Sequence, residues 1–230
     1  MAQLFHKSAN NIAKASIVGA IVLVGVAGFA YTVIARSSYL TGRYIERQQP
    51  VQFSHRHHVG DDGIDCRYCH TTVETTASAG MPPTQTCMNC HSQVKKDSPL
   101  LAAVRKSWED GTPVRWKRVH KLGDYVYFDH SRHVTRGVGC VECHGRVDEM
   151  IIVKQVEPLS MGWCLECHRN PGSRLRDALK DRITDMNWLP PGVKWEDGEA
   201  AIAAKRAEYG KALVERDHIA PPTECSRCHR

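Results

Sequence analysis

The sequence contains five copies of the pentapeptide Cys-x-x-Cys-His, which together use all ten cysteines of the 230-residue chain. In this pattern, two thiols add across the vinyl groups of one haem while the adjacent histidine binds its iron. Chance placement of the cysteines and histidines predicts roughly 0.02 copies. Zinc sites and disulfides also use cysteine pairs, but neither requires a histidine directly after the second cysteine. We therefore predict five covalently bound haem c groups.

Two sets of residues would hold these haems. The cysteines that form the thioether bonds are Cys66, Cys69, Cys87, Cys90, Cys140, Cys143, Cys164, Cys167, Cys225 and Cys228. The histidines that bind iron as proximal ligands are His70, His91, His144, His168 and His229.

The motifs form two close pairs and one C-terminal singleton, because their first cysteines lie 21, 53, 24 and 61 residues apart. The pattern Phe-x-His-x-x-His precedes each pair, which indicates two duplicated dihaem units. A six-coordinate iron needs a second axial ligand, and His55, His58, His130 and His133 are the predicted distal ligands. Residues three apart lie on one side of a helical turn, so one histidine can serve the local haem and the other a neighbour.

The fifth distal ligand has several candidates. We expect His120, just upstream of the second unit, with His218, Met81, Met150 and Met161 as alternates. A methionine would raise the potential of its haem relative to two histidines. His6 and His57 fall outside the duplicated pattern and are interpreted as ordinary polar side chains.

Residues 17–35 form a 19-residue stretch without a charge. As a helix it would span roughly 28 Å, close to the thickness of a bilayer's hydrocarbon core. A cleaved signal peptide is the alternative, but its apolar core is usually only ~7–15 residues long. We therefore expect an uncleaved single-pass anchor in a bacterial cytoplasmic membrane. Haem attachment is extracytoplasmic, which would place the haem domain on the periplasmic side.

The rest of the chain is polar, since the mean hydropathy is −0.41 even with the apolar stretch included. Haems would supply the apolar bulk that side chains do not, so we predict a mainly irregular multihaem cytochrome fold with short α-helices. A longer charged helix is expected at about Glu199 to Arg216. The predicted divisions are the anchor (1–36), a tether (37–52), two dihaem units (53–118 and 119–170), and a connector helix with the fifth haem (171–230).

The formal net charge is +6. A ferric haem with ionised propionates contributes about −1 and a ferrous one about −2, so five would shift the total to roughly +1 or −4. Nucleic-acid binding therefore has little support.

The doubled pattern resembles the small class III multihaem cytochromes. The fuller string Phe128-Asp-His130-Ser-Arg-His133, Gly139-Cys140-Val-Glu-Cys143-His144-Gly145 and Met161-Gly-Trp163-Cys164-Leu-Glu-Cys167-His168-Arg169-Asn-Pro171 resembles the pentahaem subunit of alternative complex III, a bacterial quinol:electron-acceptor oxidoreductase. The resemblance implies that quinol is oxidised elsewhere in the complex. It also implies an iron–sulfur subunit, a monohaem cytochrome and polytopic membrane subunits as partners, with a soluble cytochrome c or blue-copper protein as acceptor.

Three functions are compatible with this pattern. The favoured one is a relay of electrons in a respiratory or photosynthetic membrane complex, with no catalytic residues of its own. A multihaem reductase would need an open iron, whereas the spare ligands here suffice to close all five. A stand-alone quinol dehydrogenase anchored in membrane lipid is the third, because the short tether could hold the first haem near the surface.

Overall fold

The computed structural model describes residues 5–229 and divides the chain into two compact units, one through Tyr44 and one from Ile45 onward. Residues 5–229 contain no β-strand, only two isolated bridges. The boundary between the units falls inside the predicted tether.

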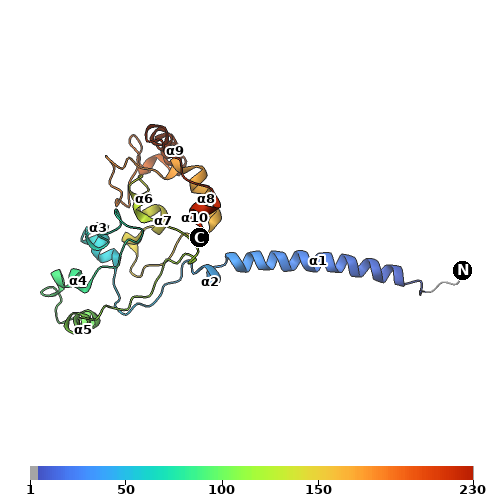
Figure 1. Cartoon of the computed structure of the whole chain (residues 1–230), viewed down its shortest axis with the longest axis horizontal. Helices are drawn as coiled ribbons and strands as arrows, with labels where there is room; N and C mark the ends of the chain where they lie inside the picture. Colours follow the sequence, from blue (N-terminus) through green and yellow to red (C-terminus); the bar gives the residue numbers. More distant parts are fainter. Residues whose placement is uncertain (1–4, 230) are drawn as a thin grey trace. The chain divides into compact units, whose positions relative to one another are not determined.

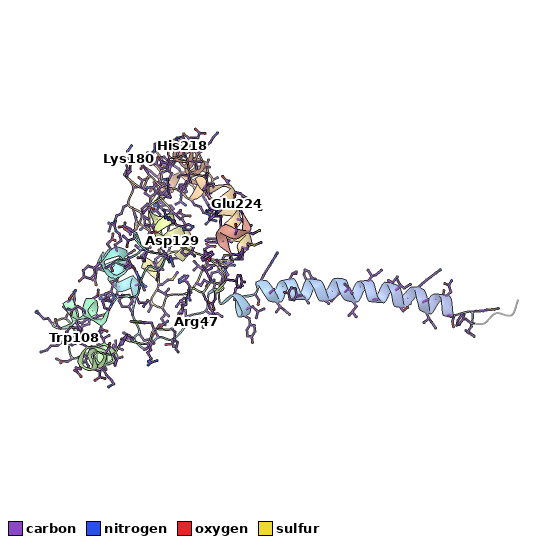
Figure 2. All side chains as sticks on the ribbon, in the orientation of Figure 1. Arg47, Trp108, Asp129, Lys180, His218 and Glu224 are labelled. Atoms are coloured by element: carbon purple, nitrogen blue, oxygen red, sulfur yellow. The ribbon has the colours of Figure 1, made fainter. Side chains whose placement is uncertain are left out.

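The first unit consists of α1 (Ala9–Arg36) and the short α2 (Ser38–Thr41). The 28 residues of α1 span about 42 Å, and its side chains are exposed along its whole length (Figure 2). It begins before the uncharged stretch, so polar residues such as Asn10 and Asn11 also belong to the helix. The helix is long and apolar enough to cross a membrane once, and a signal sequence has the same properties.

The second unit is built from short helices joined by long irregular segments (Figure 1). In chain order they are η1 (Arg56–Asp61), α3 (Cys66–Cys69), α4 (Thr84–His91), η2 (Pro99–Leu101), α5 (Ala102–Asp110), α6 (His130–Val134), α7 (Val141–His144), η3 (Val147–Glu149), α8 (Met161–Arg169), η4 (Pro171–Arg174), η5 (Trp195–Asp197), α9 (Glu199–Arg216) and α10 (Cys225–Cys228). The short helices and the single apolar N-terminal helix confirm the predicted fold class. The predicted helix at Glu199 to Arg216 is confirmed as α9.

The apolar side-chain core of the described residues is small. Its buried members are Val51, Val104, Leu175, Met186, Ile202 and Leu213. Such a core is thin for a unit of this size, as the polar composition predicts.

The two segments that carry Phe-x-His-x-x-His interlock through reciprocal backbone hydrogen bonds. The Arg56 N–H, next to His55, donates to the Met150 carbonyl (3.0 Å), and the Ser131 N–H, next to His130, donates to the Thr76 carbonyl (3.2 Å). Thr76 follows the first cysteine of its pair by ten residues, and Met150 follows its own by the same interval. Each histidine-bearing segment is therefore hydrogen-bonded to the equivalent position of the other duplicated segment.

Helix α9 packs closely against η4. The contact occurs where Gly210 meets Gly172: a Cβ added at Gly210 would collide with the Gly172 carbonyl oxygen. Ile202 and Leu213 are the buried apolar side chains of this helix. The contact therefore fixes α9 to the segment that directly follows the fourth motif.

Candidate haem-binding sites

Each of the five cysteine pairs lies on a helical turn. The pairs occupy α3, the second half of α4, the start of α7, α8 and α10. Since the two cysteines of a pair are three residues apart, a helical turn places both thiols on one side. All ten thiols are free of disulfide bonds. This is the arrangement that two thioether bonds to one porphyrin edge require.

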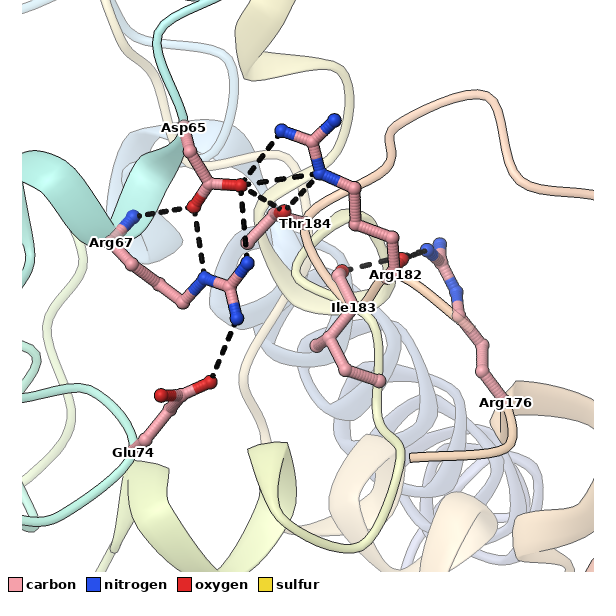
Figure 3. Close-up of polar contacts among 7 residues, drawn as sticks. All are labelled: Asp65, Arg67, Glu74, Arg176, Arg182, Ile183 and Thr184. Atoms are coloured by element: carbon pink, nitrogen blue, oxygen red, sulfur yellow. Dashed lines mark hydrogen bonds and ion pairs between the residues drawn. The ribbon is translucent and has the colours of Figure 1, made fainter. Parts of the chain in front are cut away.

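The first motif is fixed by the Asp65 carboxylate, which caps the N-terminus of α3 (Figure 3). Asp65 accepts hydrogen bonds from the Arg67 N–H (3.0 Å), from Thr184 Oγ1 (2.7 Å) and from Arg182 Nη2 (2.8 Å). Burial alone would raise the pKa of Asp65, but these hydrogen bonds outweigh it and hold the pKa well below its usual value. The carboxylate thus joins the first motif to residues 182–184.

The two copies of the Phe-x-His-x-x-His pattern have the same geometry. The ring of Phe53 meets His55 edge-on (4.8 Å, 87°) and stacks on His58 (4.3 Å, 26°). In the second copy of the pattern, Phe128 meets His130 edge-on (4.7 Å, 86°) and stacks on His133 (4.8 Å, 27°). The phenylalanine therefore holds two imidazoles in fixed directions from a single turn of chain.

Three of these distal candidates face a proximal histidine at a similar separation. Ring centres lie 6.1 Å apart for His58 and His91. They lie 6.0 Å apart for His133 and His168 and 6.4 Å apart for His130 and His144. Two imidazole nitrogens that each bind a shared metal at about 2 Å place their ring centres roughly 6 Å apart. All three pairs therefore fit one iron between two histidines.

The imidazoles are held in the tautomer that binds a metal through Nε2. The Nδ1 atoms of His58, His91, His130 and His168 lie 2.7–2.9 Å from the backbone oxygens of Ser54, Val94, Ala77 and Pro222, in that order. His70 and His133 make the same contact with the oxygens of Gly80 and Asp129. A carbonyl only accepts, so Nδ1 carries the proton and Nε2 keeps its lone pair. The residues present therefore fit the haem iron.

Burial keeps the central imidazoles neutral. It lowers the pKa of His144 to about 3, with repulsion from His120 adding to the effect. It lowers the pKa of His55 to about 4, with a further contribution from His70. Burial also raises the pKa of the Cys143 thiol to about 12. A neutral imidazole is the form that donates its lone pair to iron.

His120 lies against the third motif. Its Nε2 is 3.3 Å from Nδ1 of His144, and the two ring centres are 4.4 Å apart, which is too close for an iron to lie between them. The ring of Tyr125 stacks on the fifth proximal histidine, His229, at 5.7 Å. The structure thus brings His120 to His144.

The surroundings of the alternate ligands for the fifth iron are as follows. Met81 and Met161 are exposed, and the Met150 carbonyl accepts the Arg56 hydrogen bond. His218 follows α9 with a φ of 49°.

The sequence reasoning missed the groups that orient the histidines. Most are backbone oxygens, which any residue type supplies, so no sequence signal marks them. It also missed Arg176, which is buried and donates through Nη1 to the carbonyls of Arg182 (3.0 Å) and Asp185 (2.6 Å). Its guanidinium fills the space beside Gly139, directly before the third motif.

Residues 51–108 match the family model described as cytochrome c7 and related cytochrome c. The chain is also 37% identical over 102 residues to the menaquinone reductase, multiheme cytochrome c subunit, of Nitratidesulfovibrio vulgaris strain Hildenborough. That alignment covers 44% of this chain and 48% of the relative, so the match spans about half the length of the relative. Residues 51–108 are thus cytochrome c7-like, and this likeness implies covalent haem c as their cofactor.

Proposed function

We propose that this chain is a membrane-anchored pentahaem cytochrome that relays electrons from quinol oxidation to a periplasmic acceptor. Each of the five motifs would hold one haem c, numbered 1 to 5 in sequence order. When bound, the haems would supply one-electron transfer at iron. The single observation that carries the proposal is the three histidine pairs with ring centres 6.0–6.4 Å apart, the separation that one iron between two imidazoles requires.

The protein's own residues close and orient the irons. Nδ1–H bonds to backbone carbonyls fix the ring directions of His58 and His130, and burial keeps the imidazoles of His55 and His144 neutral. At the three irons with such a histidine pair, the two ligands would leave no position for a substrate. This favours a relay over a reductase.

We place the chain in a complex of the alternative complex III type, because of the sequence resemblance. Its partners there would be an iron–sulfur subunit, a monohaem cytochrome and polytopic membrane subunits. A second candidate is a relay that delivers electrons toward menaquinone, which the name of the relative favours. A third is a stand-alone quinol dehydrogenase.

Purification in mild detergent separates these functions. Co-elution with iron–sulfur and polytopic membrane subunits, and haem reduction by a menaquinol analogue, are the expected results. Oxidation of the reduced haems by a menaquinone analogue, with no reduction by the quinol, would support the second candidate instead. A chain that elutes alone and oxidises quinol would support the third and contradict the complex.

The proposal that each iron has two protein ligands can be tested separately. The oxidised protein should show only low-spin haem, and carbon monoxide should not bind the reduced form. One high-spin haem per chain would contradict the relay and favour a reductase.

A further inference from the structure

The first and second motifs contact each other directly. Tyr68, between the cysteines of the first motif, accepts a hydrogen bond from Asn89, between the cysteines of the second (Nδ2 to Oη, 3.2 Å). Cys69 also lies within electrostatic range of Cys87. The attachment points of haems 1 and 2 are therefore neighbours.

The first motif also contacts the third, where the two duplicated segments are joined by their reciprocal backbone hydrogen bonds. The side chains of Cys66 and Cys140 lie next to each other. Residues 182–184 form hydrogen bonds with both motifs. Thr184 Oγ1 donates to Asp65, and the Ile183 carbonyl accepts from the Cys140 N–H (3.3 Å). The attachment point of haem 1 thus lies against that of haem 3.

The third motif leads to the fourth through Arg174. Its guanidinium donates to the Glu142 carbonyl, inside the third motif (3.5 Å), and lies 5.5 Å from the ring centre of Trp163, directly before the fourth. Cys143 lies within electrostatic range of Cys167.

The fourth motif leads to the fifth. Nδ1 of His168 donates to the Pro222 carbonyl (2.7 Å), three residues before Cys225. Cys164 also lies within electrostatic range of Cys228.

We propose that the haems form one line in the order 2–1–3–4–5, so that the second haem in the sequence is a terminus and haems 1 and 3 join the two duplicated dihaem segments. This rests on the proposed function's five haems. An independent observation agrees with it: Cys90 and Cys225 are the exposed ones among the ten cysteines, and they belong to motifs 2 and 5. Electrons then enter at one of these exposed ends, leave at the other, and cross between the units at the Cys66–Cys140 contact.

A redox titration of the haem-loaded full chain, followed by nuclear magnetic resonance of the haem methyl groups, tests the order. Variants His55→Met, His58→Met and His130→Met assign haems 1, 2 and 3, because His55 lies near His70 and the other two pair with His91 and His144. Oxidation of haem 3 should shift the midpoint potential of haem 1 more than that of haem 2, since redox interaction weakens with distance. A larger shift for haem 2 would overturn the proposal.

An experimental structure of the unmodified haem-loaded protein gives a second readout that needs no variant. The iron of haem 3 should lie nearer to the iron of haem 1 than to that of haem 2, and the reverse would overturn the order. Both readouts are independent of partners. A chain that elutes alone would contradict the proposed membrane complex, and the haem order could still be measured on that chain.

Discussion

The contact of Gly210 with Gly172 predicts a large effect for Gly210→Ala. The added Cβ would collide with the Gly172 carbonyl oxygen, far inside ordinary contact distance, so α9 must move away from η4. A gap of even about 0.5–1 Å forfeits a quarter to a half of the dispersion attraction. Ile202 and Leu213 would therefore lose most of their packing.

The expected cost follows from that burial. Burying an aliphatic side chain contributes about 1.5–3 kcal/mol, so loosening two costs roughly 3–6 kcal/mol. Replacing glycine by alanine in a helix returns about 1 kcal/mol. We expect a net destabilisation of roughly 2–5 kcal/mol.

Gly162→Ala is the matched control, because Gly162 lies in α8 and a Cβ there meets nothing within 4 Å. It should leave stability unchanged or raise it by up to about 1 kcal/mol. Guanidinium unfolding of the haem-loaded proteins in detergent, followed by far-ultraviolet circular dichroism, measures both. An unchanged midpoint for Gly210→Ala would refute the close approach of α9 to η4.

Three further predictions address the sites and the anchor. His58→Ala should produce one high-spin haem that binds carbon monoxide, whereas His57→Ala, at a half-exposed neighbour that contacts Asp61, should not; closed irons in both would contradict the assignment of His58. Asp65→Asn should destabilise the protein by about 1–2 kcal/mol at pH 7. Because the folded pKa of Asp65 is depressed, its stabilisation is present above the unfolded value of 3.8 and lost as pH falls, so unfolding midpoints that differ equally at pH 7 and pH 3 would refute this origin. Replacing residues 1–36 by a cleavable export signal should release a haem-loaded protein from the membrane, as fractionation would show, and retention in the membrane would contradict the anchor.

The sequence predicted the features that depend on local spacing. The run of uncharged residues predicted α1, and the recurrence of Ile202, Arg206, Tyr209 and Leu213 at intervals of three and four residues predicted α9, because helical periodicity is visible in a single segment. The doubled Phe-x-His-x-x-His also indicated a repeated geometry, and the rings of Phe53 and Phe128 hold their histidines at nearly equal angles.

Features that join distant segments could not be predicted. The interlock of Arg56 with Met150 and the orienting carbonyl of Pro222 involve backbone groups, which no residue type marks. The contact of Cys66 with Cys140 spans the boundary between the duplicated units, and sequence order alone would place haem 2 beside haem 3. The position of His120 against His144 likewise depends on the path of an irregular segment.

Mass spectrometry of peptides from the purified native chain tests the central claim most directly. Each of the five Cys-x-x-Cys-His peptides should carry one covalently bound haem. A motif peptide recovered with free thiols, a disulfide or zinc in place of haem would contradict a five-haem relay.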